Sequence, residues 1–215
     1  MEADWEVEIG AGAPIVEAFW PGFVDLRSEP RRIGEIEEAT RFPELAKALL
    51  QLNGQGSGNQ PAPIDDAENG LVWTSKCDIW RLNSRSDSDQ TDQIDPDEMD
   101  AAPEESVVGL ACYVDLLPRS KNGFGEFDKA EKWVRAKVGR LRKTPVRCCR
   151  ADLVVRVAAI GTRDGFAVTA YISACGADDH AAGLAFGSAL AAFVSAIMNL
   201  SNAPAGNQSS SVSRS

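Results

Sequence analysis

Histidine is nearly absent from this chain of 215 residues, which carries only one, His180. A catalytic histidine needs a nucleophile and an orienting acid beside it, and the sequence holds no G-x-S-x-G turn. His180 follows Asp178 and Asp179, and aspartates at this position suit the start of a helix. The lack of a nucleophile motif argues against a serine–histidine hydrolase. The position of the two aspartates favours a helix-capping role for them.

Cysteine is scarce as well, since the chain has five and none of them forms a C-x-x-C motif. A structural zinc site needs about four thiolates or imidazoles. Cys148 and Cys149 are adjacent and would point to opposite faces of a strand, so Cys175 and His180 with one further cysteine form the alternative metal site. The full glycine pattern of a dinucleotide-binding turn is also missing. We therefore expect no metal and no cofactor.

Positive charge is in short supply, because 32 acidic residues outnumber 22 basic ones and the net charge is −10. General nucleic-acid binding begins with cations meeting phosphates, so we expect none. The chain opens without a basic segment followed by an apolar one, which predicts no secretory signal and a reducing, cytoplasmic location. A hydrophobic content of 44% excludes wholesale disorder.

One long apolar run is present, from Ala181 to Leu200, and it contains no charged residue. Its length could span a bilayer. Its large side chains fall on one stripe and small ones occupy the opposite face, which is typical of a helix that packs against a sheet. Alanine, serine and glycine also make weak membrane-inserting sequences, so we expect a core helix and no membrane span.

Three segments have the composition of loops. Residues 54–70 are rich in glycine and proline, residues 83–106 are rich in acids, and residues 201–215 are rich in serine and asparagine. None of them can bury enough apolar surface to offset the entropy of ordering it. We predict a single domain over residues 1–200 with flexible insertions at 54–70 and 83–106, followed by a disordered tail at 201–215.

Hydrophobic periodicity predicts the elements between these segments. Strands are expected near residues 5–9, 15–26, 71–82, 107–117, 151–160 and 166–175, and helices at 36–52, 124–143 and 179–199. Asp164-Gly165, with Thr162 and Arg163, predicts the hairpin turn between the last two strands. The pattern predicts an α+β domain with two layers: a mostly antiparallel sheet of about five or six strands, and three helices largely on one face.

Side-chain alternation divides each predicted strand into an apolar and a polar face. The helices should cover the apolar faces, which leaves the polar ones as a candidate recognition surface. This surface would combine acids, aromatics, an arginine and hydroxyls: Asp78, Trp80, Tyr113, Asp115, Asp152, Arg156, Thr169, Tyr171 and Ser173. A solvated outer face, whose aromatics serve strand propensity, is the plainer interpretation.

A basic block lies within the acidic chain, since residues 119–150 carry a net charge of +8. Its cations include Lys132, Arg135 and Arg140 on the predicted helix 124–143. Three interpretations stay open. The cations form a solvated helix face, bind an anionic partner, or bind the acidic segment 87–105 of the same chain.

Two functional hypotheses follow from these features. The first is a non-enzymatic binding or interaction module for an unknown protein or a small anionic ligand. It would use the sheet face and the basic helix, through Trp80, Tyr113, Arg156, Tyr171, Lys132, Arg135 and Arg140. The second is a small enzyme acting on an anionic or polar molecule, with Asp78 and Asp115 as acid and base and Arg156 as the orienting group. The residues alone leave open whether the protein is an enzyme.

Binding of the acidic segment to the basic helix is testable by deleting residues 87–105. We expect the deletion variant to elute from heparin resin at higher salt than the full chain, because the helix cations would lose their internal partner. The acidic segment can shield these cations only if it lies directly beside the helix, because at physiological salt charges interact over only about 8 Å. Elution of both proteins at the same point of one salt gradient would rule out the internal contact.

Overall fold

The computed structural model describes residues 1–10, 15–16, 24, 26, 28–53, 72–83, 108–118, 125–160 and 163–198. For residues 15–16, 72–83, 117–118, 159–160 and 163, only the backbone is described. The predicted insertion 54–70, the tail 201–215 and the acidic segment 87–105 lie outside the described residues. The predicted insertion 83–106 also lies outside them, except for Asn83, which ends a strand.

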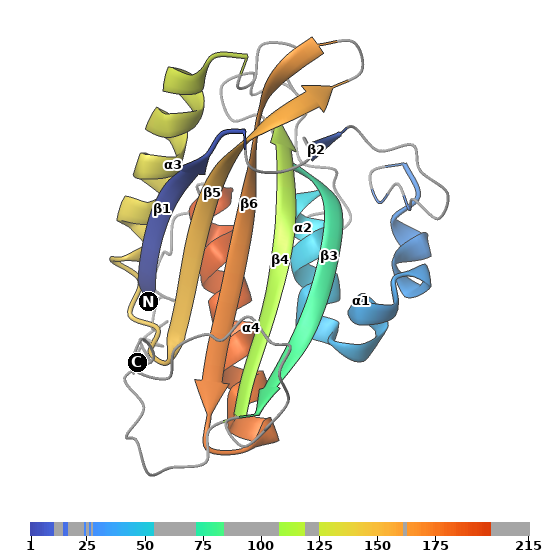
Figure 1. The fold of residues 1–215 in the computed structure, drawn as a ribbon. Coiled ribbons are helices and arrows are strands. Elements are labelled where there is room, and N and C mark those ends of the chain that lie inside the picture. Colours follow the sequence, from blue (N-terminus) through green and yellow to red (C-terminus); the bar gives the residue numbers. More distant parts are fainter. Residues whose placement is uncertain are drawn as a thin grey trace, which may run out of the picture.

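The chain forms an α+β structure with one mixed sheet, and the predicted fold class is confirmed at that level (Figure 1). In chain order the elements are β1 (Glu2–Glu8), β2 (Ile15–Val16), the 3-10 helix η1 (Pro30–Glu35), α1 (Glu37–Arg41), α2 (Pro43–Leu52), β3 (Val72–Asn83), β4 (Val108–Pro118), α3 (Phe127–Leu141), β5 (Cys149–Ile160), β6 (Arg163–Gly176) and α4 (Asp179–Ile197).

The strand order is β1-β5-β6-β4-β3, and the short β2 pairs with β5 beside β1. The pairs β5–β6, β6–β4 and β4–β3 are antiparallel, as predicted. Both β1 and β2, however, pair with β5 in parallel, so the sheet is mixed rather than mostly antiparallel. A parallel pair needs a long connection, and more than 130 residues separate Glu8 from Cys149.

The predicted hairpin between the last two strands forms, but its turn lies earlier than expected. Ile160 pairs with Arg163, and the ladder continues with Ala159 opposite Asp164 and Ala158 opposite Gly165. The Asp-Gly dipeptide therefore belongs to β6 rather than to the turn. The two strands stay paired as far as Ile160 and Arg163, because each added pair gains backbone hydrogen bonds.

The helical segments are more numerous than the three predicted. The expected helix 36–52 is divided into α1 and α2, because Phe42 is extended and Pro43 starts a new helix. Proline lacks a backbone N–H and suits the first turn of a helix, but not its interior. The expected helix 179–199 forms as α4, and the Asp178 carboxylate accepts from the Ala181 amide at 2.7 Å, as the capping argument predicts.

Helices α2, α3 and α4 lie together on one face of the sheet, with α4 between the other two (Figure 1). The strand side chains on this face are apolar and completely buried on the two central strands: Ala151, Leu153, Val155, Val168, Ala170 and Ile172. Phe186 and Phe193 of α4 are buried against them. The burial of each large side chain (Val, Leu, Ile or Phe) contributes about 1.5–3 kcal/mol to folding. This contact therefore holds the helix layer on the sheet.

Helix α4 is long and apolar enough to cross a membrane by length and composition. Its small residues, expected on an outer face, are buried as well: Ala182, Ala189, Ala192 and Ala196. The reason is that α2 and α3 flank α4 while the sheet covers its third side. At Gly187 the approach is so close that a Cβ would lie 2.8 Å from the Cγ of Glu44 in α2.

Lys137 departs from the expected solvated basic helix, because it is only 4% exposed. Its Nζ donates to the carbonyl oxygens of Ala196 at 3.1 Å and Ile197 at 2.7 Å. These acceptors belong to the last turn of α4, where carbonyls lack partners within the helix and the helix dipole is negative. Burial, followed by the charge of Arg140, lowers the pKa of Lys137 from 10.5 to about 8.

The lowered pKa of Lys137 predicts a pH dependence of stability. Between pH 8 and pH 10.5 the unfolded chain holds a proton on Lys137 that the folded protein has released, so this group makes unfolding less favourable as the pH rises. We expect the free energy of unfolding of the wild type to increase relative to Lys137→Met across this window, measured by urea denaturation at constant ionic strength. A difference between the two proteins that does not change with pH would contradict this.

Candidate functional site

The register places the predicted polar residues on one face of the sheet. Across the five long strands, Asp4, Asp152, Tyr171, Tyr113 and Asp78 stand opposite one another in a single row. Residues directly opposite on paired strands project to the same face. No helix of the described ranges covers this face in Figure 1.

We call this surface the polar sheet face. It consists of the residues that alternate with the buried apolar rows, namely Asp78, Trp80, Tyr113, Asp115, Asp152, Arg156, Thr169, Tyr171 and Ser173. For Asp78 and Trp80 the structure gives the strand position alone. The sequence-based division into two faces agrees with the register for β4, β5 and β6, and for β3 from Cys77 onward. Before Cys77, an irregularity in β3 places Thr74 opposite the buried Leu116, so the two faces are exchanged there.

Tyr171 lies at the centre of the polar sheet face. Its hydroxyl accepts from the Arg156 guanidinium at 3.1 Å, and the guanidinium carbon lies 6.0 Å from the ring centroid. The Tyr113 ring lies on the other side, with 6.1 Å between ring centroids. Arg156 also forms an ion pair with Glu8 at 2.5 Å. A continuous set of contacts therefore runs from β1 to β4.

Two buried polar atoms of this face have no hydrogen-bond partner among the described residues. They are the Arg156 Nε, a donor, and the Asp152 Oδ1, an acceptor. The other Asp152 oxygen accepts from the Arg150 Nε at 2.7 Å. An unpaired buried polar group costs about 1–3 kcal/mol and is rare in folded proteins. Both atoms belong to β5, so an unused donor and an unused acceptor lie on the same strand face.

Asp115 and Thr169 form a buried pair beside Tyr171. Asp115 is 8% exposed and Thr169 is 1% exposed, and the Thr169 hydroxyl donates to the Asp115 Oδ1 at 2.7 Å. Asp78 stands opposite Tyr113, which places it diagonally across from Asp115 on the same face. Such diagonal positions are about 7–8 Å apart, so the two aspartates proposed as acid and base are neighbours in the sheet.

The predicted basic residues lie elsewhere. Lys132, Arg135 and Arg140 belong to α3, in the helix layer on the opposite side of the sheet (Figure 1). Arg135 pairs with Glu131 at 2.7 Å and lies 4.4 Å from the Trp5 ring centroid. The polar sheet face and the basic helix are therefore separate surfaces, because the sheet lies between them.

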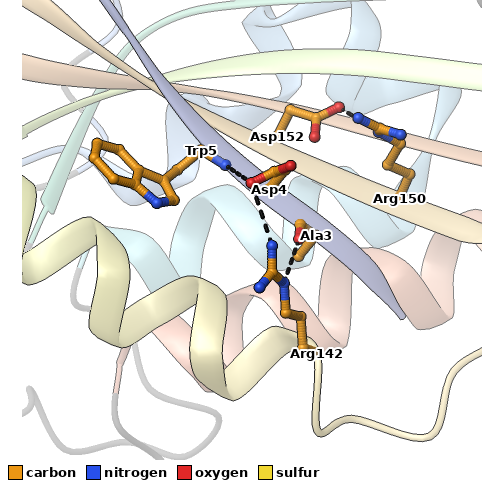
Figure 2. A network of polar contacts seen from close by, with 6 residues as sticks. All are labelled: Ala3, Asp4, Trp5, Arg142, Arg150 and Asp152. Carbon is orange, nitrogen blue, oxygen red and sulfur yellow. Dashed lines mark hydrogen bonds and ion pairs between the residues drawn. The ribbon is translucent and has the colours of Figure 1, made fainter.

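One cation of the basic block, Arg142, contacts another part of the same chain. Figure 2 shows Arg142 at the end of α3, where its guanidinium donates to the Ala3 carbonyl at 2.7 Å and to the Asp4 carboxylate at 3.2 Å. Arg150 and Asp152 lie on the other side of the strands in the same view. Arg142 thus links the edge strand β1 to the end of α3.

The cysteines and the histidine form no metal site within the part of the chain that the structure describes. Cys112 is buried in the core, as expected for a small hydrophobe, whereas Cys148, Cys149 and Cys175 lie where β5 begins and β6 ends. His180 is exposed in the first turn of α4 and lines a shallow groove with Glu44 and Phe42 of the α2 region.

Glu8 and Asp4 also belong to the site, although neither is predicted as a member from the sequence. Both were on the acidic side of an alternating strand, and that alternation was visible in the sequence. Their place beside Arg156 and Asp152 depends on the parallel pairing of β1 with β5. Such a pairing joins segments more than 130 residues apart in the sequence and has no local signal.

Comparisons with protein-family models, curated proteins and solved structures find no match to this chain. The function therefore has to be inferred from the chemistry of the site itself. This is also the sounder basis, because α+β folds host many unrelated functions.

The buried Thr169–Asp115 bond is testable by substitution. Thr169→Val removes the hydroxyl donor and leaves a buried carboxyl oxygen without it, so we expect the free energy of unfolding to fall by about 1–3 kcal/mol in urea denaturation. Thr169→Ser keeps the donor and is the matched control, expected to lose less. Equal stability of the valine and serine variants would mean that this hydrogen bond does not stabilise the sheet.

Proposed function

We propose that the protein is a non-enzymatic binding module and that its ligand binds to the polar sheet face. The observation that carries this proposal is the pair of unpartnered buried atoms on β5, Asp152 Oδ1 in the row of Tyr171 and Arg156 Nε four residues further along the strand. A ligand that offers one acceptor and one donor, and that displaces the groups covering these atoms, would satisfy both. The folded protein bears the cost of leaving these groups unpaired, and binding would recover it.

The charge of the face favours a donor-rich ligand. The described acids that project from it are Glu2, Asp4, Glu6, Glu8, Asp115 and Asp152, whereas its bases are Arg150 and Arg156. An anionic ligand would meet net repulsion here. We therefore assign the polar sheet face to a segment of a partner protein whose N–H groups or cations face the acids and whose carbonyl or carboxylate reaches Arg156.

Tyrosine suits such a role. Tyr113 and Tyr171 offer flat apolar rings with a polar tip, and Tyr171 is 37% exposed. Aromatic and arginine side chains often carry most of the binding free energy at protein interfaces. The small anionic ligand considered from the sequence would fit the outer side of α3 better, where Lys132 and Lys143 are exposed.

The proposal is tested by selecting peptides from a displayed random library on the full chain and measuring their affinity by calorimetry. Selected peptides should carry donors or cations, and binding to the Trp80→Ala/Tyr113→Ala/Tyr171→Ala variant should weaken at least tenfold, which corresponds to about 1.4 kcal/mol. Arg156→Gln should weaken it as well. Lys132→Ala on α3 is the matched control and should bind as the wild type does. Peptides that bind the triple variant with unchanged affinity would refute this assignment.

The enzyme hypothesis has one observation in its favour. Asp115 is a buried carboxyl group diagonal to Asp78, with Arg156 on the same face, and a buried carboxyl can serve as an acid. Under this alternative, Asp115→Asn would abolish turnover of a substrate that still binds. Under the binding proposal, no chemical change accompanies binding, and mass spectrometry of the recovered peptide distinguishes the two.

A further inference from the structure

Two thiols meet where β5 begins and β6 ends. The ladder pairs Cys149 with Ala174, which places Cys148 opposite Cys175, and the Cys175 amide donates to the Cys148 carbonyl at 3.0 Å. Residues directly opposite in antiparallel strands have Cα atoms about 4.5–5.5 Å apart. This separation lies inside the range of about 4.4–6.8 Å that a disulfide spans.

The pair has one exposed and one buried member. Cys148 is exposed and has a φ of 55°, a left-handed conformation that side chains rarely adopt. Cys175 is 5% exposed. Burial raises the pKa of the Cys175 thiol, and the charge of the neighbouring Cys148 raises it further. Cys175 therefore keeps its proton while Cys148 meets reagents from solution.

The remaining described thiols are placed differently. Cys149 points to the helix side, where its Sγ donates to the carbonyls of Arg147 at 3.0 Å and Ala185 at 3.4 Å. Burial raises its pKa to about 12, with the charges of Cys148 and Cys175 adding to the effect. Cys112 is enclosed in the core, 1% exposed. Neither has the exposure that attack on a reagent requires.

The connection after Cys175 holds it in place. A Cβ on Gly176 would lie 2.3 Å from the Ala182 backbone nitrogen, so the first turn of α4 packs directly on this point of the chain. Gly109 of β4 stands on the other side of Cys175 and adds no side chain there. The two thiols are thus held together by backbone that has little room to move apart.

We propose that Cys148 and Cys175 form a reversible thiol–disulfide site that reacts with low-molecular-weight disulfides. The Cys148 thiolate attacks one sulfur of the small disulfide, which forms a mixed disulfide and releases one small thiolate. Cys175 then releases its proton to solvent and attacks the Cys148 sulfur. This step forms the Cys148–Cys175 bond and releases the second small thiolate. The protein loses two electrons, and the small disulfide gains them.

This site goes beyond the proposed binding function and needs no ligand on the sheet. It lies at the end of the β5–β6 ladder, near Arg150 and Ser173, which are paired on these two strands. The new bond would close the hairpin of β5 and β6 at its open end. Oxidation would then fix the strand ends that lead into α4.

The test is oxidation of the full chain in glutathione buffers of increasing disulfide content, followed by acid quenching and peptide mapping without reductant. Trypsin cleaves after Arg147 and Arg150, so Cys148 and Cys149 fall in one fragment. Mapping is therefore done on Cys149→Ser, whose hydroxyl can keep the contacts of that thiol. We expect fragment 148–150 to be linked to fragment 164–214, and the protein to be lighter by two hydrogen atoms.

Two variants separate the steps of the reaction. Cys175→Ser should keep one glutathione on Cys148, because the second attack is lost, and Cys175→Ala repeats the comparison if serine disturbs the fold. Cys148→Ser should carry neither the adduct nor the bond. The proposal is overturned if the glutathione adduct persists on Cys148 of the wild type to the extent seen in Cys175→Ser. A linkage through Cys77 or Cys112, or no reaction at Cys148, would overturn it as well.

Discussion

The packing of α4 between the sheet and its two neighbouring helices is the contact on which the rest of the structure depends. The helix offers large residues such as Phe186 and Phe193 to the sheet, and its alanines let α2 and α3 approach closely. The apolar faces of the central strands are completely buried in this contact. The buried ammonium of Lys137 then binds the last carbonyls of α4, so a charge that would be costly alone completes a helix end.

Because one face of the sheet is fully used for the core, every functional group on the strands must project from the other. Parallel pairing brings β1 to the edge of β5, and its acids then line the same face as Asp152 and Arg156. The Glu8–Arg156–Tyr171 contacts depend on this arrangement. Charged residues from β1 and β5, which are distant in the sequence, therefore lie beside the two tyrosines of this face.

The cations that form one basic block in the sequence have different roles in the folded protein. Arg142 binds the edge strand, Arg135 contacts Trp5, and Lys137 is buried. Cations that form a single block in sequence therefore contribute to packing as well as to a surface. The sheet separates the exposed members of that block, such as Lys132, from the polar sheet face, so the two surfaces would recognise different ligands.

Local periodicity was enough to predict the two strand faces, helices α3 and α4, the β5–β6 hairpin and the cap at Asp178, because each depends on residues a few positions apart. Pro43 is also a local signal for the break between α1 and α2, but the apolar pattern on both sides of it predicted one continuous helix. The tertiary structure alone decided the parallel place of β1, the burial of Lys137 and the meeting of Cys148 with Cys175. These features join segments distant in sequence, and their cause is the shared burial of one apolar layer, which no short window of residues contains.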